Sequence, residues 1–418
     1  MKLLSQSGIY LGASLLSKAA PFLLLPVMTR YLTPAEFGAL SLFLLINSCV
    51  GAFVGMNIHA NISKSFFSLS REQLSDLVGN ILTIMLTASL LITAFFAVLA
   101  LYTDSAFSLP ITSFLLMPLL SFMMMVNTIN LTILRNEERA YVYGIFEVAC
   151  TFLIVSVTVL LLMVTDMGWY SQVVSLLVTY GLFFCIAIYY MYRRGYLRLN
   201  VVGAELGKIL KLSLPMIPYV LAGIVMNISD RMFIERMVGL DAVGHYAIGY
   251  NFGMVVLVFT DAFNKAWSPW FYKFMLSPEL GRKERVVRYT YLYIAFIFAL
   301  VGLVALMSHF VIPWMVTQSF YEAAGYVFWI ALAFAVQGVY KMLFPYFILM
   351  DRNYALSGIL VSAALLNLVF NYFLIGAYGA VGAAYSSVLA WMAAVIMAFI
   401  YKRRFYAMPW GLRGEKAN

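Results

Sequence analysis

Charge is what this 418-residue sequence has least of, because only 11% of its residues are Asp, Glu, Lys or Arg while 64% are hydrophobic. Soluble domains are nearer one quarter charged. The mean hydropathy is +0.91. This composition excludes a soluble enzyme, a disordered chain and a secreted scaffold built on disulfides. Apolar blocks of about twenty residues recur instead, which is the length that crosses a bilayer as a helix.

Cysteine and histidine are also scarce, with three of each. Cys49, Cys150 and Cys185 lie inside apolar segments without the spacing of metal ligands, so they are expected to pack as small hydrophobes. The sequence has no phosphate-binding Gly-Lys-Ser/Thr loop and no Gly-X-Ser-X-Gly motif. We therefore expect no cofactor, no metal and no direct use of ATP.

The apolar blocks predict an all-α polytopic membrane protein with twelve transmembrane helices. Helices are expected because only helices and closed barrels satisfy their backbone groups in lipid. The predicted spans are 8–29, 37–60, 78–101, 110–134, 141–164, 171–192, 211–229, 242–264, 289–309, 323–348, 355–375 and 379–401.

The distribution of Lys and Arg predicts the orientation of these spans. With the N-terminus inside, the inner segments carry 21 basic residues and the outer loops carry three. Basic loops favour the cytoplasm, so both termini are expected there. The net charge of +9 is attributed to these loops and to a cationic cavity, not to nucleic acid. The expected organisation is an N-lobe 1–192, a cytoplasmic linker 193–210, a C-lobe 211–401 and a cytoplasmic tail 402–418.

The two halves show an internal repeat. Arg30 is followed by Gly38 in the first outer loop, and Arg236 is followed by Gly244 in the corresponding loop, at an offset of 206. An even number of spans in each half gives both halves the same orientation. We therefore expect two parallel six-helix repeats around a central cavity, with Gly38 superposing on Gly244.

Several short motifs resemble the polysaccharide transporter family. They are Arg30-Tyr-Leu-Thr-Pro-Ala-Glu-Phe-Gly38, Leu212-Ser-Leu-Pro-Met-Ile-Pro218, Ser229-Asp-Arg-Met-Phe-Ile234 and Gly244-His-Tyr246. This family includes the O-antigen flippases and belongs to the multidrug/oligosaccharidyl-lipid/polysaccharide exporter superfamily. The resemblance implies two six-helix lobes around a cavity. It also implies transfer of undecaprenyl-diphosphate-linked glycans between the leaflets of a bacterial inner membrane.

Polar residues inside the spans are the candidate site residues, because charges at membrane depth usually face a cavity or a partner. A cationic cavity would bind an anionic diphosphate, and amides would bind sugar hydroxyls. The expected substrate-binding residues are Lys18, His59, Asn227, Arg231, Lys265, Gln337 and Lys341, and the expected coupling residues are Glu147, Asp230 and Asp261.

Structural roles remain open for some of these residues. Asp261 is four residues from Lys265 and could neutralise it within one helical turn, and Asp230 could do the same for Arg231. His59 is predicted near the cytoplasmic surface of the membrane, and its side chain could simply reach the headgroups or form a hydrogen bond. Lys18 and Lys341 have no carboxylate three or four residues away, so each needs water, a partner helix or a ligand.

Three functions are compatible with the sequence. The first is a flippase for a lipid-linked oligosaccharide, such as an O-antigen unit of lipopolysaccharide, with membrane lipid and other surface-polysaccharide assembly proteins as partners. The second is a cation-coupled exporter of small molecules or drugs from the same superfamily, which an acidic cavity would favour. The third is a membrane-embedded enzyme acting on the same lipid, which would need a larger outer loop or a catalytic cluster.

The charge distribution yields a test of topology. A cysteine introduced at position 198, in the basic linker, should resist a membrane-impermeant thiol reagent added to intact spheroplasts and should react after lysis. Labelling of this cysteine from the periplasmic side would reverse the predicted orientation.

Overall fold

The computed structural model describes the chain apart from residues 1, 57–61, 64, 199–205, 208, 210–216, 276, 278–280, 351, 407 and 411–418. Several helical residues, including Lys18 and Asn227, are described by their backbone alone. The predicted residue His59 lies outside the described residues.

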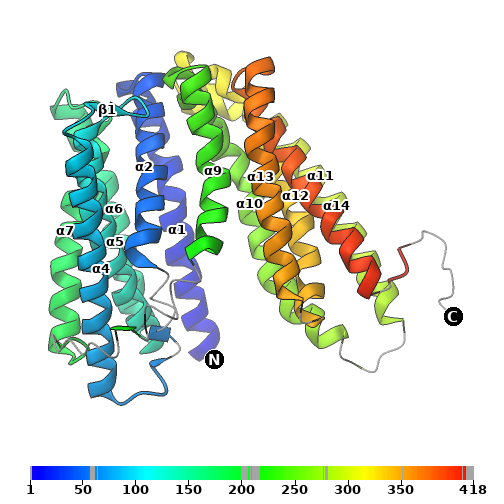
Figure 1. Cartoon of the computed structure of the whole chain (residues 1–418), viewed down its shortest axis with the longest axis horizontal. Helices are drawn as coiled ribbons and strands as arrows, with labels where there is room; N and C mark the ends of the chain where they lie inside the picture. Colours follow the sequence, from blue (N-terminus) through cyan, green and yellow to red (C-terminus); the bar gives the residue numbers. More distant parts are fainter. Residues whose placement is uncertain are drawn as a thin grey trace. The chain divides into compact units, whose positions relative to one another are not determined.

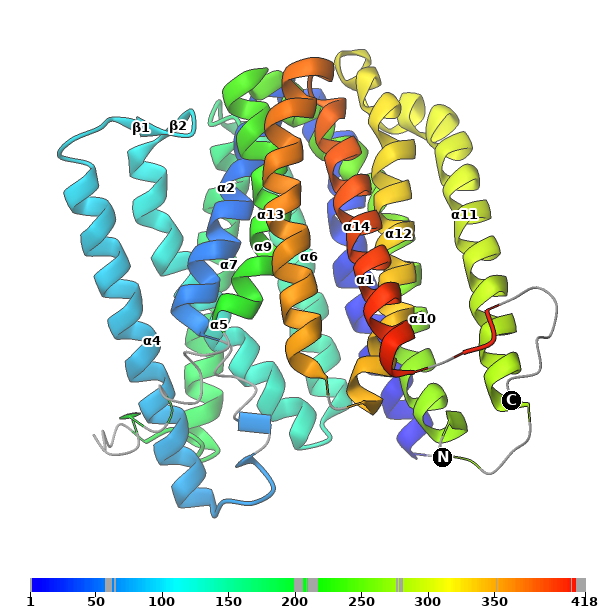
Figure 2. The ribbon, with the colours of Figure 1, turned by 45° about the vertical axis from the view of Figure 1, so that its right-hand side comes forward.

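Twelve long α-helices occupy the described part of the chain, which confirms the predicted all-α architecture (Figures 1 and 2). They are α1 (Lys2–Tyr31), α2 (Pro34–Gly55), α4 (Arg71–Leu99), α5 (Ile111–Asn136), α6 (Ala140–Val164), α7 (Tyr170–Arg193), α9 (Ile217–Met237), α10 (Leu240–Met275), α11 (Arg282–Met315), α12 (Ala324–Leu349), α13 (Asn353–Tyr378) and α14 (Val381–Phe405). A two-stranded hairpin, β1 (Ser105–Ala106) and β2 (Leu109–Pro110), joins α4 to α5, and a short 3-10 helix, η2 (Gln318–Ala323), precedes α12.

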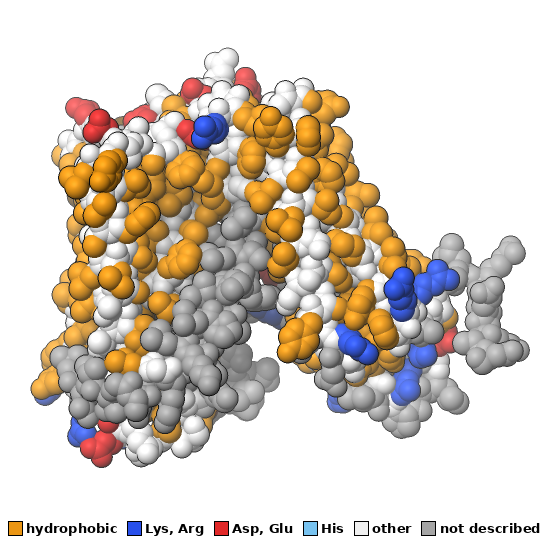
Figure 3. Space-filling view, in the orientation of Figure 1, with side chains coloured by type: hydrophobic (Ala, Val, Ile, Leu, Met, Phe, Trp, Pro, Cys, Tyr) orange, Lys and Arg blue, Asp and Glu red, His pale blue; other side chains and the backbone are white. Residues whose placement is uncertain are grey.

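Ten of the described helices are long and apolar enough to cross a bilayer, all of them except α1 and α9. Hydrophobic side chains cover the flanks of the helices in view, and charged side chains gather toward their ends (Figure 3). A helix that exposes apolar flanks needs a lipid environment, because water would penalise that surface. The chain is therefore a multi-pass membrane protein.

The chain divides into two compact units, Met1–Ile224 and Val225–Asn418. The division falls inside α9, whereas half of the predicted linker 193–210 lies outside the described residues. The predicted lobe boundary and the superposition of the two halves remain predictions.

In the first unit, α1 packs on α6, and α5 packs on α2, α4 and α7. Two of its helices begin with capping boxes, in which Thr33 pairs with Glu36 and Ser70 pairs with Gln73. Small residues let α2 approach α5 closely, because a Cβ added at Gly55 would lie 2.7 Å from the sulfur of Met125. Such close approach is a usual basis of helix association in lipid.

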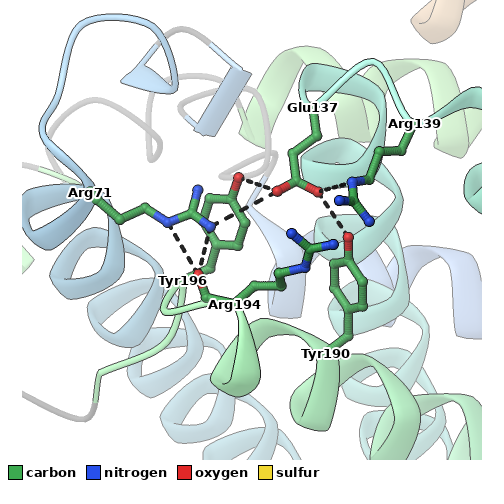
Figure 4. A network of polar contacts seen from close by, with 6 residues as sticks. All are labelled: Arg71, Glu137, Arg139, Tyr190, Arg194 and Tyr196. Carbon is green, nitrogen blue, oxygen red and sulfur yellow. Dashed lines mark hydrogen bonds and ion pairs between the residues drawn. The ribbon is translucent and has the colours of Figure 1, made fainter.

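A polar network joins the ends of α4, α5 and α7 in the first unit (Figure 4). The Glu137 carboxylate accepts hydrogen bonds from the hydroxyls of Tyr190 at 2.8 Å and Tyr196 at 2.7 Å. The guanidinium groups of Arg139 and Arg71 lie 3.5 Å and 3.9 Å from the carboxylate. Arg71 also donates to the Arg194 carbonyl at 2.5 Å and stacks over the Tyr196 ring. Burial and the hydrogen bond to Glu137 raise the pKa of Tyr196 to about 12, so this phenol remains a donor at neutral pH.

In the second unit, α12 packs against α10, α11 and α14, and α13 packs against α14. Glycines permit the close contact of α10 with α12, since a Cβ at Gly253 would lie 2.7 Å from Ile330. The predicted eighth span ended at 264, but α10 continues through Pro269 to Met275. Trp267 and Phe271 are buried in this extension, and their packing outweighs the interruption that proline brings to a helix.

The Glu137 network yields a stability prediction with a matched control. Glu137→Gln should lower the free energy of unfolding in mixed micelles by about 2–3 kcal/mol, because it removes the charged acceptor shared by two tyrosine hydroxyls. Glu72 forms an ion pair with Arg198 at the surface, where their side chains are 70% and 57% exposed. Glu72→Gln removes this pair and should lower the free energy of unfolding by at most about 1 kcal/mol. Equal losses in the two variants would contradict a bracing role for Glu137.

Candidate functional site

A buried carboxylate lies in the second unit, within about two turns of the helix ends that surround it. Asp230 of α9 is 4% exposed. Its oxygens accept hydrogen bonds from the amide of Asn371 at 2.9 Å, the hydroxyl of Ser387 at 2.9 Å and the hydroxyl of Tyr246 at 3.2 Å. These donors come from α13, α14 and α10, so Asp230 ties four helices of the unit together. A buried carboxylate needs such donors because an isolated charge is costly in a low-dielectric interior.

Further amides and hydroxyls adjoin Asp230. Ser229 donates to the Asn367 side-chain oxygen at 3.0 Å, and the amide of Asn371 lies 3.2 Å from the same oxygen. Both asparagines are fully buried. The Oδ1 atom of Asn371 and the Nδ2 atom of Asn367 have no hydrogen-bond partner among the described residues. The cluster therefore keeps polar capacity that a proton, a water molecule or a small cation could use.

Arg231 lies beside this cluster but binds an aromatic face. Its guanidinium carbon is 4.5 Å from the Tyr250 ring centre and 6.0 Å from that of Tyr246. The side chain is 5% exposed, and its Nε atom has no hydrogen-bond partner within the described part of the chain. The sequence allowed Asp230 simply to neutralise Arg231. The structure adds three neutral donors to Asp230 and cation–π contacts to Arg231, while the Arg231 charge still acts on Asp230 through space.

A second charged pair joins α12 to α10. The Nζ atom of Lys341 lies 2.6 Å from Oδ1 of Asp261, and their side chains are 22% and 47% exposed. For Lys341 the sequence left open water, a partner helix or a ligand, and it offered Asp261 as a partner for Lys265. In the structure a partner helix, α10, supplies Asp261 to Lys341. Gln337, one turn from Lys341, has a buried side-chain oxygen without a hydrogen-bond partner among the described residues.

The Asp230 cluster and the Lys341–Asp261 pair differ in what they can do chemically. Asp230 is sealed from solvent, so it suits the storage of a proton or a cation. The Lys341 ammonium is partly accessible and has N–H groups beyond the one that Asp261 accepts, so it can bind an anion that competes with Asp261. Charged groups with partial exposure inside an apolar span mark a polar path or a ligand site.

The other predicted site residues are not gathered at these two pairs. Lys265 is exposed on α10. Glu147 is half-buried on α6, one turn from Thr151, whose hydroxyl lies 2.9 Å from that of Ser17 on α1. Nothing is described for the side chains of Lys18, His59 and Asn227, so their roles remain predictions.

Sequence reasoning missed Tyr246, Ser387 and His245. The first two complete the Asp230 cluster from other helices. Tyr246 and His245 stand in the motif Gly244-His-Tyr246, but the motif gave no sign that Tyr246 would contact Asp230. His245 contacts the Ser319 carbonyl through Nε2 at 2.8 Å and the Glu322 carboxylate through Nδ1 at 3.1 Å, which attaches α10 to η2. The described residues contain no group of three or more His, Cys, Asp or Glu side chains placed to hold a metal.

Solved structures with a similar fold are transporters. An inward-facing multidrug resistance MATE transporter of the MOP superfamily matches with a TM-score of 0.67 at 14% identity, covering 93% of this chain and 94% of that one. The lipid II flippase MurJ in an inward closed conformation matches with a TM-score of 0.66 at 13% identity, covering 95% of this chain and 87% of that one. At these identities the likeness concerns the fold alone.

Sequence comparison gives a relative and a family. The "Lsg locus putative protein 1" of Haemophilus influenzae is 25% identical over 368 residues, which is 85% of this chain and 87% of that protein. The family described as "Polysaccharide biosynthesis protein" matches residues 3–275. This match spans more than half of the sequence and confirms the family resemblance of its motifs. The chain belongs to the polysaccharide biosynthesis protein family.

Proposed function

We propose that this protein is a flippase that moves an undecaprenyl-diphosphate-linked oligosaccharide from the inner to the outer leaflet of a bacterial inner membrane by alternating access. Membership in a polysaccharide biosynthesis family supports a glycan substrate. The fold similarity to MurJ, a lipid II flippase, supports a lipid-linked one. O-antigen units of lipopolysaccharide belong to this substrate class.

The Lys341–Asp261 pair is the observation that carries the proposal. It is a cation at membrane depth, held in place by a carboxylate yet partly open. A diphosphate can displace a carboxylate from an ammonium because it carries more negative charge and more acceptor oxygens. Gln337, one turn from Lys341, would extend this binding surface. The expected roles of Lys18, His59, Asn227, Arg231 and Lys265 in substrate binding remain predictions.

Asp230 favours a coupling role. A carboxylate that is buried among amides and hydroxyls can exchange its donors for a proton or a monovalent cation. This observation also favours the second candidate function, a cation-coupled exporter, which the MATE-like fold accommodates. We rank this function second because the partly accessible charge is the ammonium of Lys341, and a cation suits an anionic substrate. An enzyme acting on the same lipid ranks third.

The charge pair yields a prediction that separates binding from structure. Lys341→Ala should abolish most glycan export in a strain lacking the native gene, and Lys341→Arg should retain more. The double variant Lys341→Ala/Asp261→Ala removes both charges, so it leaves no uncompensated carboxylate at membrane depth. If Lys341 binds the diphosphate, the double variant should stay as defective as Lys341→Ala, with normal amounts of folded protein in the membrane. Restored export in the double variant would show that Lys341 only neutralises Asp261.

The membrane potential is expected to be the larger driving force. A transferred charge gains about 2.3 kcal/mol per 100 mV, so two diphosphate charges crossing the whole field would gain roughly 4–5 kcal/mol. In proteoliposomes holding purified lipid-linked glycan, an inside-negative potential should accelerate outward flipping at equal pH and equal sodium.

Asp230 provides the control for this experiment. Any residual dependence on a proton or sodium gradient should disappear in Asp230→Asn, while the acceleration by potential persists. A flipping rate that ignores the potential and follows an ion gradient would make ion antiport the mechanism.

A further inference from the structure

An aromatic groove lies between α10 and α11 in the second unit, with α11 at the edge of the bundle (Figure 2). Its volume is about 550 Å³, within the range of small-molecule sites. The lining residues are Phe263, Ala266, Trp267, Trp270, Tyr289, Leu292, Tyr293 and Phe296. On each helix they recur at steps of three or four, so each helix contributes one continuous face.

The aromatic walls hold one another in place. The Phe263 ring stacks on Tyr293 at 4.4 Å between centres and on Trp267 at 5.8 Å. Trp270 meets Tyr289 edge to face at 5.4 Å. Because these rings are already ordered, a ligand that enters the groove does not have to immobilise them.

The groove opens to the lipid side of the unit and is closed at its floor. Leu292 and Phe296 are 56% and 55% exposed, whereas Trp267 and Tyr293 are each 4% exposed. The indole N–H of Trp267 has no hydrogen-bond partner among the described residues. The outer rim is therefore available to a molecule that arrives from the bilayer.

The floor of the groove adjoins the Lys341–Asp261 pair. A Cβ at Gly338 of α12 would lie 2.5 Å from the Tyr293 hydroxyl and 2.6 Å from the Thr260 methyl. Gly338 is three residues before Lys341, and Thr260 immediately precedes Asp261. An apolar groove thus leads from the lipid-facing surface to within one helical turn of a partly open ammonium.

We propose that this groove binds the isoprenoid chain of the lipid-linked substrate, with its diphosphate directed toward Lys341. The inference rests on the proposed flippase function and names the part of the protein that recognises the lipid. The charge of Lys341 complements the diphosphate, and the groove complements the chain attached to it. Six of the eight lining residues are aromatic, and their flat faces suit the planar double bonds and projecting methyl groups of an isoprenoid better than a saturated acyl chain.

The first test is photolabelling of the full-length protein in nanodiscs with geranylgeranyl diphosphate that carries a diazirine on its chain. Peptide mass spectrometry should locate the label on α10 and α11, between residues 263 and 296. Ala266→Phe fills the groove and should reduce labelling about tenfold. Ala262→Phe is the matched control, because Ala262 is exposed on the same helix but does not line the groove; its labelling should stay within about twofold of wild type.

Competition distinguishes the chain of the substrate from that of a membrane phospholipid. Undecaprenyl diphosphate should displace the label, and Lys341→Ala should weaken labelling about tenfold. Equal displacement by phosphatidylglycerol would identify the groove as a phospholipid-binding site and overturn the proposal. Labelling that depends on Lys273 and Arg285, at the ends of the helices, and not on Lys341 would have the same meaning.

Transport assays separate failure of the groove from failure of the function. Ala266→Phe should raise the KM for an undecaprenyl-linked glycan about tenfold, whereas Ala262→Phe should leave this KM within about twofold of wild type. Two outcomes would overturn the isoprenoid site while the flippase function stands. One is wild-type flipping with no label in the groove, and the other is equal labelling and flipping in Ala266→Phe and Ala262→Phe. The opposite result is a groove that is labelled, and labelled less in Ala266→Phe, in a protein that flips no glycan. It would uphold the isoprenoid site and overturn the flippase function.

Discussion

The pairing of charge inside an apolar bundle is the constraint on which the rest of this structure depends. An isolated charge at membrane depth costs several kcal/mol, and in the second unit Asp230 and Lys341 are held by partners on other helices. Asp230 obtains three donors from three helices, and Lys341 obtains Asp261 from α10. These contacts join helices in a medium where hydrophobic burial contributes little to their association.

The degree of exposure separates the two charged clusters and suggests two tasks. A sealed carboxylate responds to protons or small cations, while a partly open ammonium responds to a ligand. In a carrier, the first kind of group biases the return of the empty protein and the second recognises the cargo. The adjacent aromatic groove adds a place for an apolar chain, so one unit combines features suited to the head and the tail of an amphiphile. The polysaccharide biosynthesis family and the likeness to MurJ fit a cargo of that kind.

The sequence predicted the fold more completely than the site. Blocks of apolar residues near twenty in length are a direct consequence of bilayer thickness, so all twelve helices could be located. The continuation of α10 past Pro269 was missed because it depends on packing of Trp267 and Phe271, which a local pattern does not reveal. The Lys341–Asp261 contact was missed for a similar reason, since the two residues are 80 positions apart and meet only through the packing of α12 on α10. Helical spacing likewise gave no indication that Asn371 of α13 would donate to Asp230 of α9.

The most direct test of the account is the lipid composition of a strain that lacks this gene. Mass spectrometry of extracted lipids should show accumulation of an undecaprenyl-diphosphate-linked oligosaccharide, with loss of the corresponding surface glycan. A plasmid carrying the wild-type gene should reverse both effects. An unchanged pool of lipid-linked glycans, together with increased sensitivity to small toxic cations, would contradict the flippase account and identify the protein as an exporter.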